Sequence, residues 1–163
     1  MEKELFEVFV HSSKAYYSDR FDQYQEGKKF TFNLPAFLFG VFWFLYRKMH
    51  WEAFILFILM LLYSIIEDII LKYYHLTFTD FGIGTKIIGG VVFSTIIGYI
   101  GNRIYIKHAI REINSIKRRY QYDEELIKEQ VRKKGGTSLI AIGIILTLLI
   151  SIIVIAQKFG QQY

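Results

Sequence analysis

Long apolar stretches alternate with polar, charged segments along the chain. Residues 51–71, 81–101 and 137–156 each approach the roughly 20 apolar residues that a helix needs to cross about 30 Å of hydrocarbon. The last stretch includes 19 consecutive residues without a charge, from Ser138 to Ala156, and is the clearest span. The pattern therefore predicts three transmembrane helices.

A fourth apolar stretch, within residues 34–50, is too short to be another span. Its apolar run from Leu34 to Tyr46 has 13 residues, which is about 20 Å of helix at about 1.5 Å per residue. Asn33 stands where a helix N-cap belongs, and Pro35 suits the first helical turn. We expect a half-length helix that dips into the membrane and returns, or that lies in the interface.

The polar segments also have helical patterns. Residues 1–33 form an amphipathic segment, in which Ser12–Ser13 precede a helix that ends near Gly27. One face of this helix carries Tyr16, Tyr17, Phe21 and Tyr24. Residues 102–136 form a helical hairpin whose second helix begins near Asp123 and ends at Gly135–Gly136. Its first helix continues the second span, with apolar residues at three- and four-residue steps: Ile106, Ala109, Ile110, Ile113, Ile116 and Tyr120.

The distribution of basic residues predicts the orientation in the membrane. Residues 102–136 contain ten Lys and Arg residues, whereas residues 72–80 and the tail at 157–163 contain one each. Because basic loops stay on the cytoplasmic side, we expect residues 102–136 and the N-terminal segment inside and the C-terminal tail outside. The alternative is that residues 34–46 cross a locally thinned bilayer, with the N-terminus outside.

Composition narrows the classes of function. Apolar residues make up 53% and aromatic residues 18% of the 163-residue chain, more apolar surface than a soluble domain covers with its polar side chains. The chain has no cysteine, which excludes disulfides, thiolate metal sites and a cysteine nucleophile. Residues 1–14 carry three Glu residues and no long apolar run, so we expect no cleavable signal peptide.

Small residues recur every four positions in two of the predicted spans. They are Gly90, Ser94 and Gly98 in residues 81–101, and Gly143, Thr147 and Ser151 in residues 137–156. Such stripes let helices approach closely in lipid. We expect the two stripes to face each other within one chain, and a homodimer seam is the alternative.

Polar residues near the predicted membrane boundaries are the candidate functional groups. Asn102, Tyr105 and His108 follow a span at three-residue steps, so one helix face presents them to a polar ligand or to the half-length segment. We expect them to form an interfacial hydrogen-bond cluster that fixes how the helix leaves the membrane. Glu112, four residues beyond His108, is placed to hold its proton. Asp68 and Lys72 have the same spacing and predict an ion pair at the outer boundary.

Basic side chains supply the expected contacts with anionic lipid headgroups, although an ordinary positive-inside loop has the same composition. These candidates are Arg47, Lys48, Lys107, Arg111, Lys117, Arg118 and Arg119. Interspersed acids argue against nucleic-acid binding. Too few ligands gather for a metal, and no nucleophile, base and orienting group form a set, so neither a cofactor nor catalysis is expected.

Two stretches resemble the signatures of a bacterial membrane family labelled domain of unknown function 2628. They are residues 32–49, FNLPAFLFGVFWFLYRKM, and residues 101–108, GNRIYIKH, in which the Asn, Tyr and His recur. The resemblance covers roughly residues 12–155. It implies a bacterial inner-membrane protein and implies no activity.

The sequence thus predicts an all-α membrane protein with three transmembrane helices, one short re-entrant or interfacial helix and a cytoplasmic helical hairpin. We expect a small non-enzymatic scaffold or adaptor that binds a protein partner, a second copy or anionic lipid at the cytoplasmic face. One alternative is an accessory subunit of a transporter or channel. The least favoured alternative is an enzyme acting on lipid headgroups through Asn102 and His108.

Overall fold

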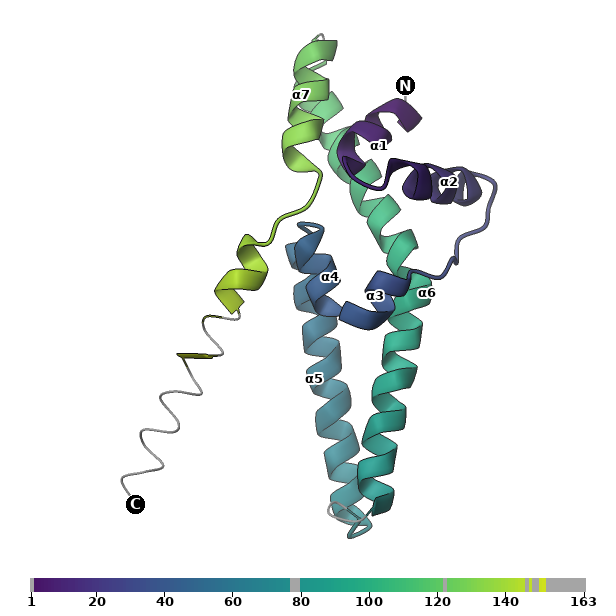
Figure 1. Cartoon of the computed structure of the whole chain (residues 1–163), viewed down its shortest axis with the longest axis vertical. Coiled ribbons are helices and arrows are strands. Elements are labelled where there is room, and N and C mark those ends of the chain that lie inside the picture. Colours follow the sequence, from purple (N-terminus) through teal and green to yellow (C-terminus); the bar gives the residue numbers. More distant parts are fainter. Residues whose placement is uncertain (1, 77–79, 122, 146, 148–149, 152–163) are drawn as a thin grey trace.

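The computed structural model describes residues 2–76, 80–121, 123–145, 147, 150 and 151. Within these residues the chain is helical, and seven helices are delimited: α1 (Glu2–Val10), α2 (Lys14–Gln25), α3 (Leu34–Phe39), α4 (Val41–Tyr46), α5 (His50–Tyr73), α6 (Asp80–Arg119) and α7 (Glu124–Lys134). The two long helices α5 and α6 run side by side as a stem (Figure 1). Above it, α1, α2, α7 and the end of α6 beyond Gly101 form a headpiece, and α3 and α4 lie between the two parts (Figure 1).

The helix α1 is the element that the sequence pattern did not indicate. Its apolar residues Leu5, Phe6, Phe9 and Val10 are all buried, at most 4% exposed. They recur at the one- and four-residue steps of a helix face. This face packs against α2, α6 and α7, so the first ten residues supply much of the headpiece core.

The half-length segment is two short helices rather than the single helix expected. Asn33 caps α3 as predicted, because its side-chain oxygen accepts a hydrogen bond from the backbone N–H of Ala36 at 2.9 Å. Gly40 then separates α3 from α4 with a φ of +48°, a conformation that other residues rarely adopt. The chain therefore turns at Gly40, and α4 rises beside α5 toward the headpiece (Figure 1).

Backbone hydrogen bonds fix the chain between α7 and the last apolar stretch. The N–H of Gly136 donates to the carbonyl of Phe9 at 2.7 Å, and the N–H of Ser138 donates to the carbonyl of Tyr46 at 2.8 Å. The amine of Lys48 donates to the carbonyl of Gly135 at 2.6 Å. As a result, the residues that follow Ser138 begin beside α4.

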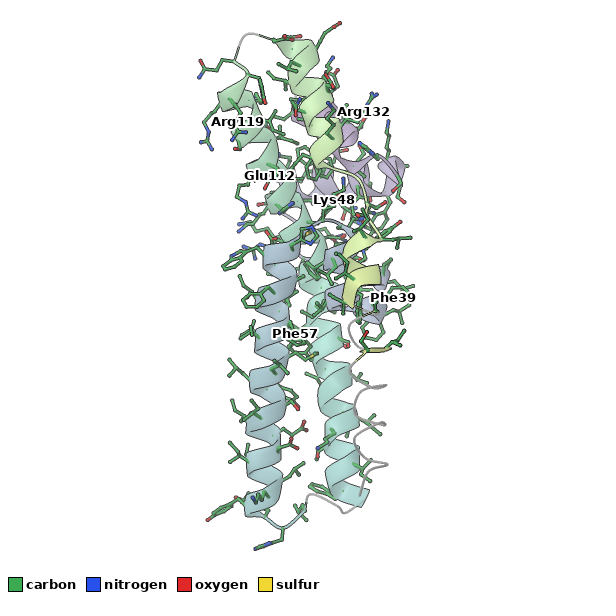
Figure 2. All side chains as sticks on the ribbon, turned by 90° about the vertical axis from the view of Figure 1, so that its left-hand side faces the viewer. Phe39, Lys48, Phe57, Glu112, Arg119 and Arg132 are labelled. Carbon is green, nitrogen blue, oxygen red and sulfur yellow. The ribbon has the colours of Figure 1, made fainter. Side chains whose placement is uncertain are left out.

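Two helices in the described part of the chain are long and apolar enough to cross a membrane, not three. They contain the predicted spans 51–71 and 81–101. Residues 146, 148, 149 and 152–156 of the predicted span at 137–156 and the whole tail at 157–163 lie outside the described residues. Large apolar side chains of the stem are exposed, for example Ile69 at 63% and Ile87 at 64%. Figure 2 shows these carbon-rich side chains along the lower part of both long helices.

The small-residue stripes do not face each other in the described residues. A side chain added at Gly90 or Gly143 would meet nothing within 4 Å. The contact between α5 and α6 instead involves Gly89, whose surface is covered by the ring of Tyr63. Thr147 and Ser151 donate hydrogen bonds to backbone carbonyls four residues earlier in the chain.

The outer ion pair also differs from the prediction. Asp68 pairs with Lys86 of α6, with 2.7 Å between Oδ1 and Nζ, instead of with Lys72 of its own helix. The pair links α5 to α6 near the turn at the far end of the stem. It therefore ties two helices together, which an intrahelical pair does not do.

Candidate functional site

A buried amide pair docks α3 on α6. The side-chain nitrogen of Asn33 donates to Oδ1 of Asn102 at 2.8 Å. The side-chain nitrogen of Asn102 donates to the hydroxyl of Thr31 at 3.0 Å and to that of Tyr16 at 2.9 Å. Asn33 and Asn102 are at most 1% exposed. Asn102 therefore connects α6 to α2 and to the residues directly before α3. Its bond with Asn33 is the contact with the half-length segment that the sequence suggested.

Two glycines of α6 let α3 approach closely. A side chain at Gly98 would lie 2.7 Å from the ring of Phe32, and one at Gly101 would lie 2.9 Å from the Cβ of Ala36. Both distances are too short for carbon–carbon contact. The nearest neighbours of Gly98 are therefore Phe32 and Phe37, at the start of the half-length segment, whereas the expected partner was the last span.

Tyr105 lies in the aromatic centre of the headpiece rather than beside Asn102. It is fully buried, with ring centroids of Tyr17 at 5.0 Å and Trp43 at 6.0 Å. Its hydroxyl is buried without a hydrogen-bond partner. Burial also raises the pKa of the neighbouring Tyr17, and the positive charge of Arg47 opposes that rise. The aromatic centre of the headpiece therefore surrounds the positive charge of Arg47 with largely apolar side chains.

That cation, Arg47, is the most unusual side chain of the structure. It follows the last residue of α4 and is only 6% exposed. Its guanidinium carbon lies 4.5 Å from the ring centroid of Tyr17 and 5.1 Å from that of Tyr105. The Nε and Nη1 atoms are buried without a hydrogen-bond partner. Among the described residues, no carboxylate forms an ion pair with it.

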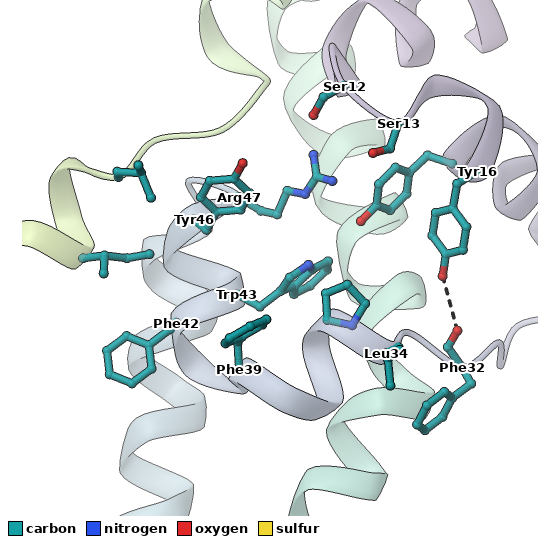
Figure 3. Close-up of a pocket in the computed structure, with 14 residues that line it drawn as sticks. Ser12, Ser13, Tyr16, Phe32, Leu34, Phe39, Phe42, Trp43, Tyr46 and Arg47 are labelled. Carbon is teal, nitrogen blue, oxygen red and sulfur yellow. Dashed lines mark hydrogen bonds between the residues drawn. The ribbon is translucent and has the colours of Figure 1, made fainter.

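A pocket of about 810 Å³ opens beside this guanidinium. Its polar end is formed by Arg47, Ser12 and Ser13, and its apolar end includes Phe39 and Phe42 (Figure 3). Leu139 and Ile142, from the start of the last apolar stretch, close one side. The sequence suggested Arg47 as a basic residue of the surface, but it did not indicate that the side chain is buried, because this burial depends on the docking of α2 and α6.

A family model described as "Protein of unknown function (DUF2628)" matches residues 4–111, which is well over half of the chain. The chain belongs to this family. The match includes most of α1 and all of the Arg47 pocket except Leu139 and Ile142, and it ends before α7. The resemblance seen in the sequence extended over residues 12–155. No curated protein and no solved structure matches the chain.

His108 of this DUF2628 protein pairs with Glu52 and not with Glu112 as the helical spacing suggested. Its Nδ1 lies 3.0 Å from Oε1 of Glu52, and Nη2 of Arg111 lies 2.5 Å from the same oxygen. Glu112 instead faces Lys134 at 3.5 Å. His108 is 7% exposed, so this ion-pair cluster fixes the start of α5 against α6.

The three polar residues of the second signature therefore serve three separate contacts. Asn102 docks α3, Tyr105 packs beneath Arg47, and His108 holds α5. Among the residues that the DUF2628 structure describes, no group of three His, Asp or Glu side chains is placed to hold a metal ion.

Three of the predicted headgroup contacts are not free cations on the surface of the DUF2628 protein. Arg47 is buried under aromatic rings, Lys48 binds the carbonyls at the end of α7, and Arg111 pairs with Glu52. Lys107, Arg118 and Arg119 are exposed on α6, and Lys117 is partly exposed. The surface thus offers fewer free cations than the sequence suggested, and the pocket offers one buried cation.

Proposed function

We propose that this DUF2628 protein is a small, non-enzymatic bacterial inner-membrane protein that holds anionic lipid at the cytoplasmic face. The observation that carries the proposal is the exposed apolar surface of the stem, which ends where the polar headpiece begins. Apolar patches of this extent on an isolated chain mark contact with lipid or with another protein. The basic residues of 102–136 favour the headpiece on the cytoplasmic side.

The geometry of α6 divides its exposed and partly exposed basic residues into two groups. Lys107 lies six residues beyond Gly101 and Arg118 lies 17 beyond it, about 9 Å and about 25 Å along a helix. The helix continues away from the stem, and Arg119 lies near the far end of the headpiece (Figure 2). Because the field of anionic lipid falls off within about 10 Å at 0.1 M salt, we assign headgroup contact to Arg103 and Lys107. Lys117, Arg118 and Arg119 are then available to a protein partner.

Membrane insertion is tested by fractionation and by labelling single cysteines, which the cysteine-free chain permits directly. The chain should remain in the membrane after an alkaline carbonate wash. In intact spheroplasts a membrane-impermeant maleimide should label His75→Cys and should label Arg118→Cys only after lysis. Release by carbonate would refute insertion, and labelling of Arg118→Cys in intact spheroplasts would refute the orientation.

The lipid role is tested by measuring the lipids that remain with the purified protein. Anionic lipids should be enriched over their share of the source membrane, and Arg103→Gln with Lys107→Gln should reduce that enrichment. Arg118→Gln with Arg119→Gln is the matched control, since it removes the same charge farther from the stem. A transporter or channel subunit that co-purifies in a fixed ratio, without enrichment of lipid, would favour the alternative of an accessory subunit.

A further inference from the structure

We propose that the pocket beside Arg47 binds one anionic glycerophospholipid, with the lipid phosphate on the guanidinium and an acyl chain on the apolar wall. The inference rests on the proposed membrane location and goes beyond it, because it assigns a single built site instead of a charged surface. It also gives a function to the buried cation, which the other contacts of the headpiece do not explain.

The first argument is the unsatisfied charge. Arg47 is 6% exposed, and two of its nitrogen atoms are buried without acceptors. Burying an ionised group without a counterion is costly, so such groups are paired or bind a ligand. A guanidinium presents its N–H groups as a planar fork that fits two oxygens of a phosphate. Arg47 lines the pocket, and none of the described residues that line it is an Asp or a Glu.

The second argument is the amphipathic lining. Ser12 and Ser13 lie at the Arg47 end, whereas Phe39, Phe42 and Ile142 supply an apolar wall (Figure 3). A small soluble anion would use the polar end alone and would leave the wall in contact with water. A phospholipid matches both ends. The volume of about 810 Å³ suits a headgroup and the upper part of a chain, because ligand pockets of roughly 300–1,000 Å³ enclose drug-sized molecules.

The third argument is the position of the pocket. Residues of α2, α3 and α4 line it. The helices α3 and α4 lie between the headpiece and the stem (Figure 1). Leu38 and Phe39 next to the pocket are 60% and 61% exposed. In the proposed orientation this level coincides with the cytoplasmic headgroups, so a lipid would enter sideways, with its tails directed along the stem.

Quenching of Trp43 fluorescence by brominated lipid tests the site. Trp43 lines the pocket, and Trp51→Phe removes the other tryptophan of the chain, which is 68% exposed. The full chain is placed in phosphatidylcholine bilayers with small amounts of phosphatidylglycerol carrying brominated acyl chains. We expect saturable quenching by brominated phosphatidylglycerol and much weaker quenching by brominated phosphatidylcholine at the same fraction. Equal quenching by both lipids would overturn the proposal.

The Arg47→Met variant removes the charge and keeps a long side chain. The half-saturating lipid fraction should rise about tenfold to hundredfold, which corresponds to loss of a charge-assisted contact. Arg118→Met, the matched control, should bind as the parent does. Arg47→Lys should fall between the two, because it keeps the charge and loses the fork. Unchanged binding by a folded, membrane-inserted Arg47→Met would overturn the site and leave the proposed function standing.

Two further measurements keep the test decisive. Ser12→Asp places a carboxylate at the exposed mouth of the pocket and should weaken binding of the lipid even if Arg47→Met does not fold. Inorganic phosphate added at millimolar concentration should not displace the lipid. If phosphate alone competes fully, the site takes a soluble anion and the lipid assignment is wrong. Failure of the chain to enter membranes at all would instead refute the proposed function.

Discussion

Replacing Asn102 by leucine should destabilise the protein more than any other single exchange of a polar residue on α6. Asn102 is 1% exposed and is bonded to Asn33, Thr31 and Tyr16. Leucine has the same branched arrangement of four side-chain heavy atoms, so the exchange leaves no cavity and acts mainly on the hydrogen bonds. The change in unfolding free energy therefore reports mainly on the hydrogen bonds of Asn102 and less on the packing around it.

The expected size follows from the partners left behind. The side-chain nitrogen of Asn33 loses its acceptor inside the protein, and an orphaned buried donor costs about 1–3 kcal/mol. The hydroxyl of Tyr16 keeps its bond to the carbonyl of Phe32, at 3.3 Å, and the hydroxyl of Thr31 loses one bond. With about 1 kcal/mol for each lost neutral bond, the total loss of unfolding free energy is roughly 2–4 kcal/mol.

The assay is denaturant unfolding of the purified full chain in detergent, monitored by circular dichroism. Asn114→Leu is the matched control, since Asn114 is on the same helix and forms no side-chain hydrogen bond with the described residues. The control should change the unfolding free energy by less than about 0.5 kcal/mol. If Asn102→Leu behaves like this control, the amide joint does not hold α3 on α6 and the reasoning is refuted.

Three further exchanges test other contacts. Gly135→Ala places its Cβ against a backbone carbonyl of α1 and should lower the unfolding free energy by about 1–3 kcal/mol in the same assay. Its control, Gly90→Ala, has open space around the added Cβ and should not lower the unfolding free energy. Phe6→Ala removes a fully buried ring and should cost about 3–5 kcal/mol; a cost under 1 would mean that α1 is not docked. A hydrogen bond from Lys128 lowers the pKa of Glu4, so this pair stabilises the contact of α1 with α7 above the usual Glu pKa. That contribution is lost as the pH falls through the lowered value, and Glu4→Gln should therefore lower the melting temperature slightly at pH 7 but not in acid.

Local signals in the sequence predicted the ends of several helices correctly. Asn33 and Asp123 cap α3 and α7 through their side-chain oxygens, and α7 ends directly before Gly135. These helix ends depend on a few neighbouring residues and on the geometry of a helix terminus, so they can be predicted from the local sequence. The continuation of the second long helix through Ile106 and Ala109 follows from periodicity in the same way.

Features that depend on distant segments were not visible in the sequence. Phe6 and Phe9 have the spacing of a helix face, but Glu residues stand among them. Only the contacts of α1 with α2, α6 and α7 show that this face is buried. The break at Gly40 requires a positive φ. Glycine adopts positive and negative φ with similar ease, so its presence in the sequence does not show that the helix breaks there. Arg47 stands at the end of an apolar block, where a basic residue ordinarily reaches water. Only the docking of Tyr17 and Tyr105 around it makes the side chain buried.

The energetics of Arg47 connect the fold to the proposed lipid. Stacking on aromatic rings contributes about 2 kcal/mol or more to a desolvated cation, whereas removing an ion from water costs several kcal/mol even after the protein relaxes. The rings of Tyr17 and Tyr105 therefore do not fully offset the burial of this charge. A bound phosphate would recover the difference. It would do so beside Tyr17 of α2, Tyr46 of α4 and Tyr105 of α6, whose ring centroids lie within 6.0 Å of the guanidinium carbon. On this reasoning an anion in the pocket stabilises the headpiece, because the charge that holds the anion is also the charge that no carboxylate of the described residues pairs.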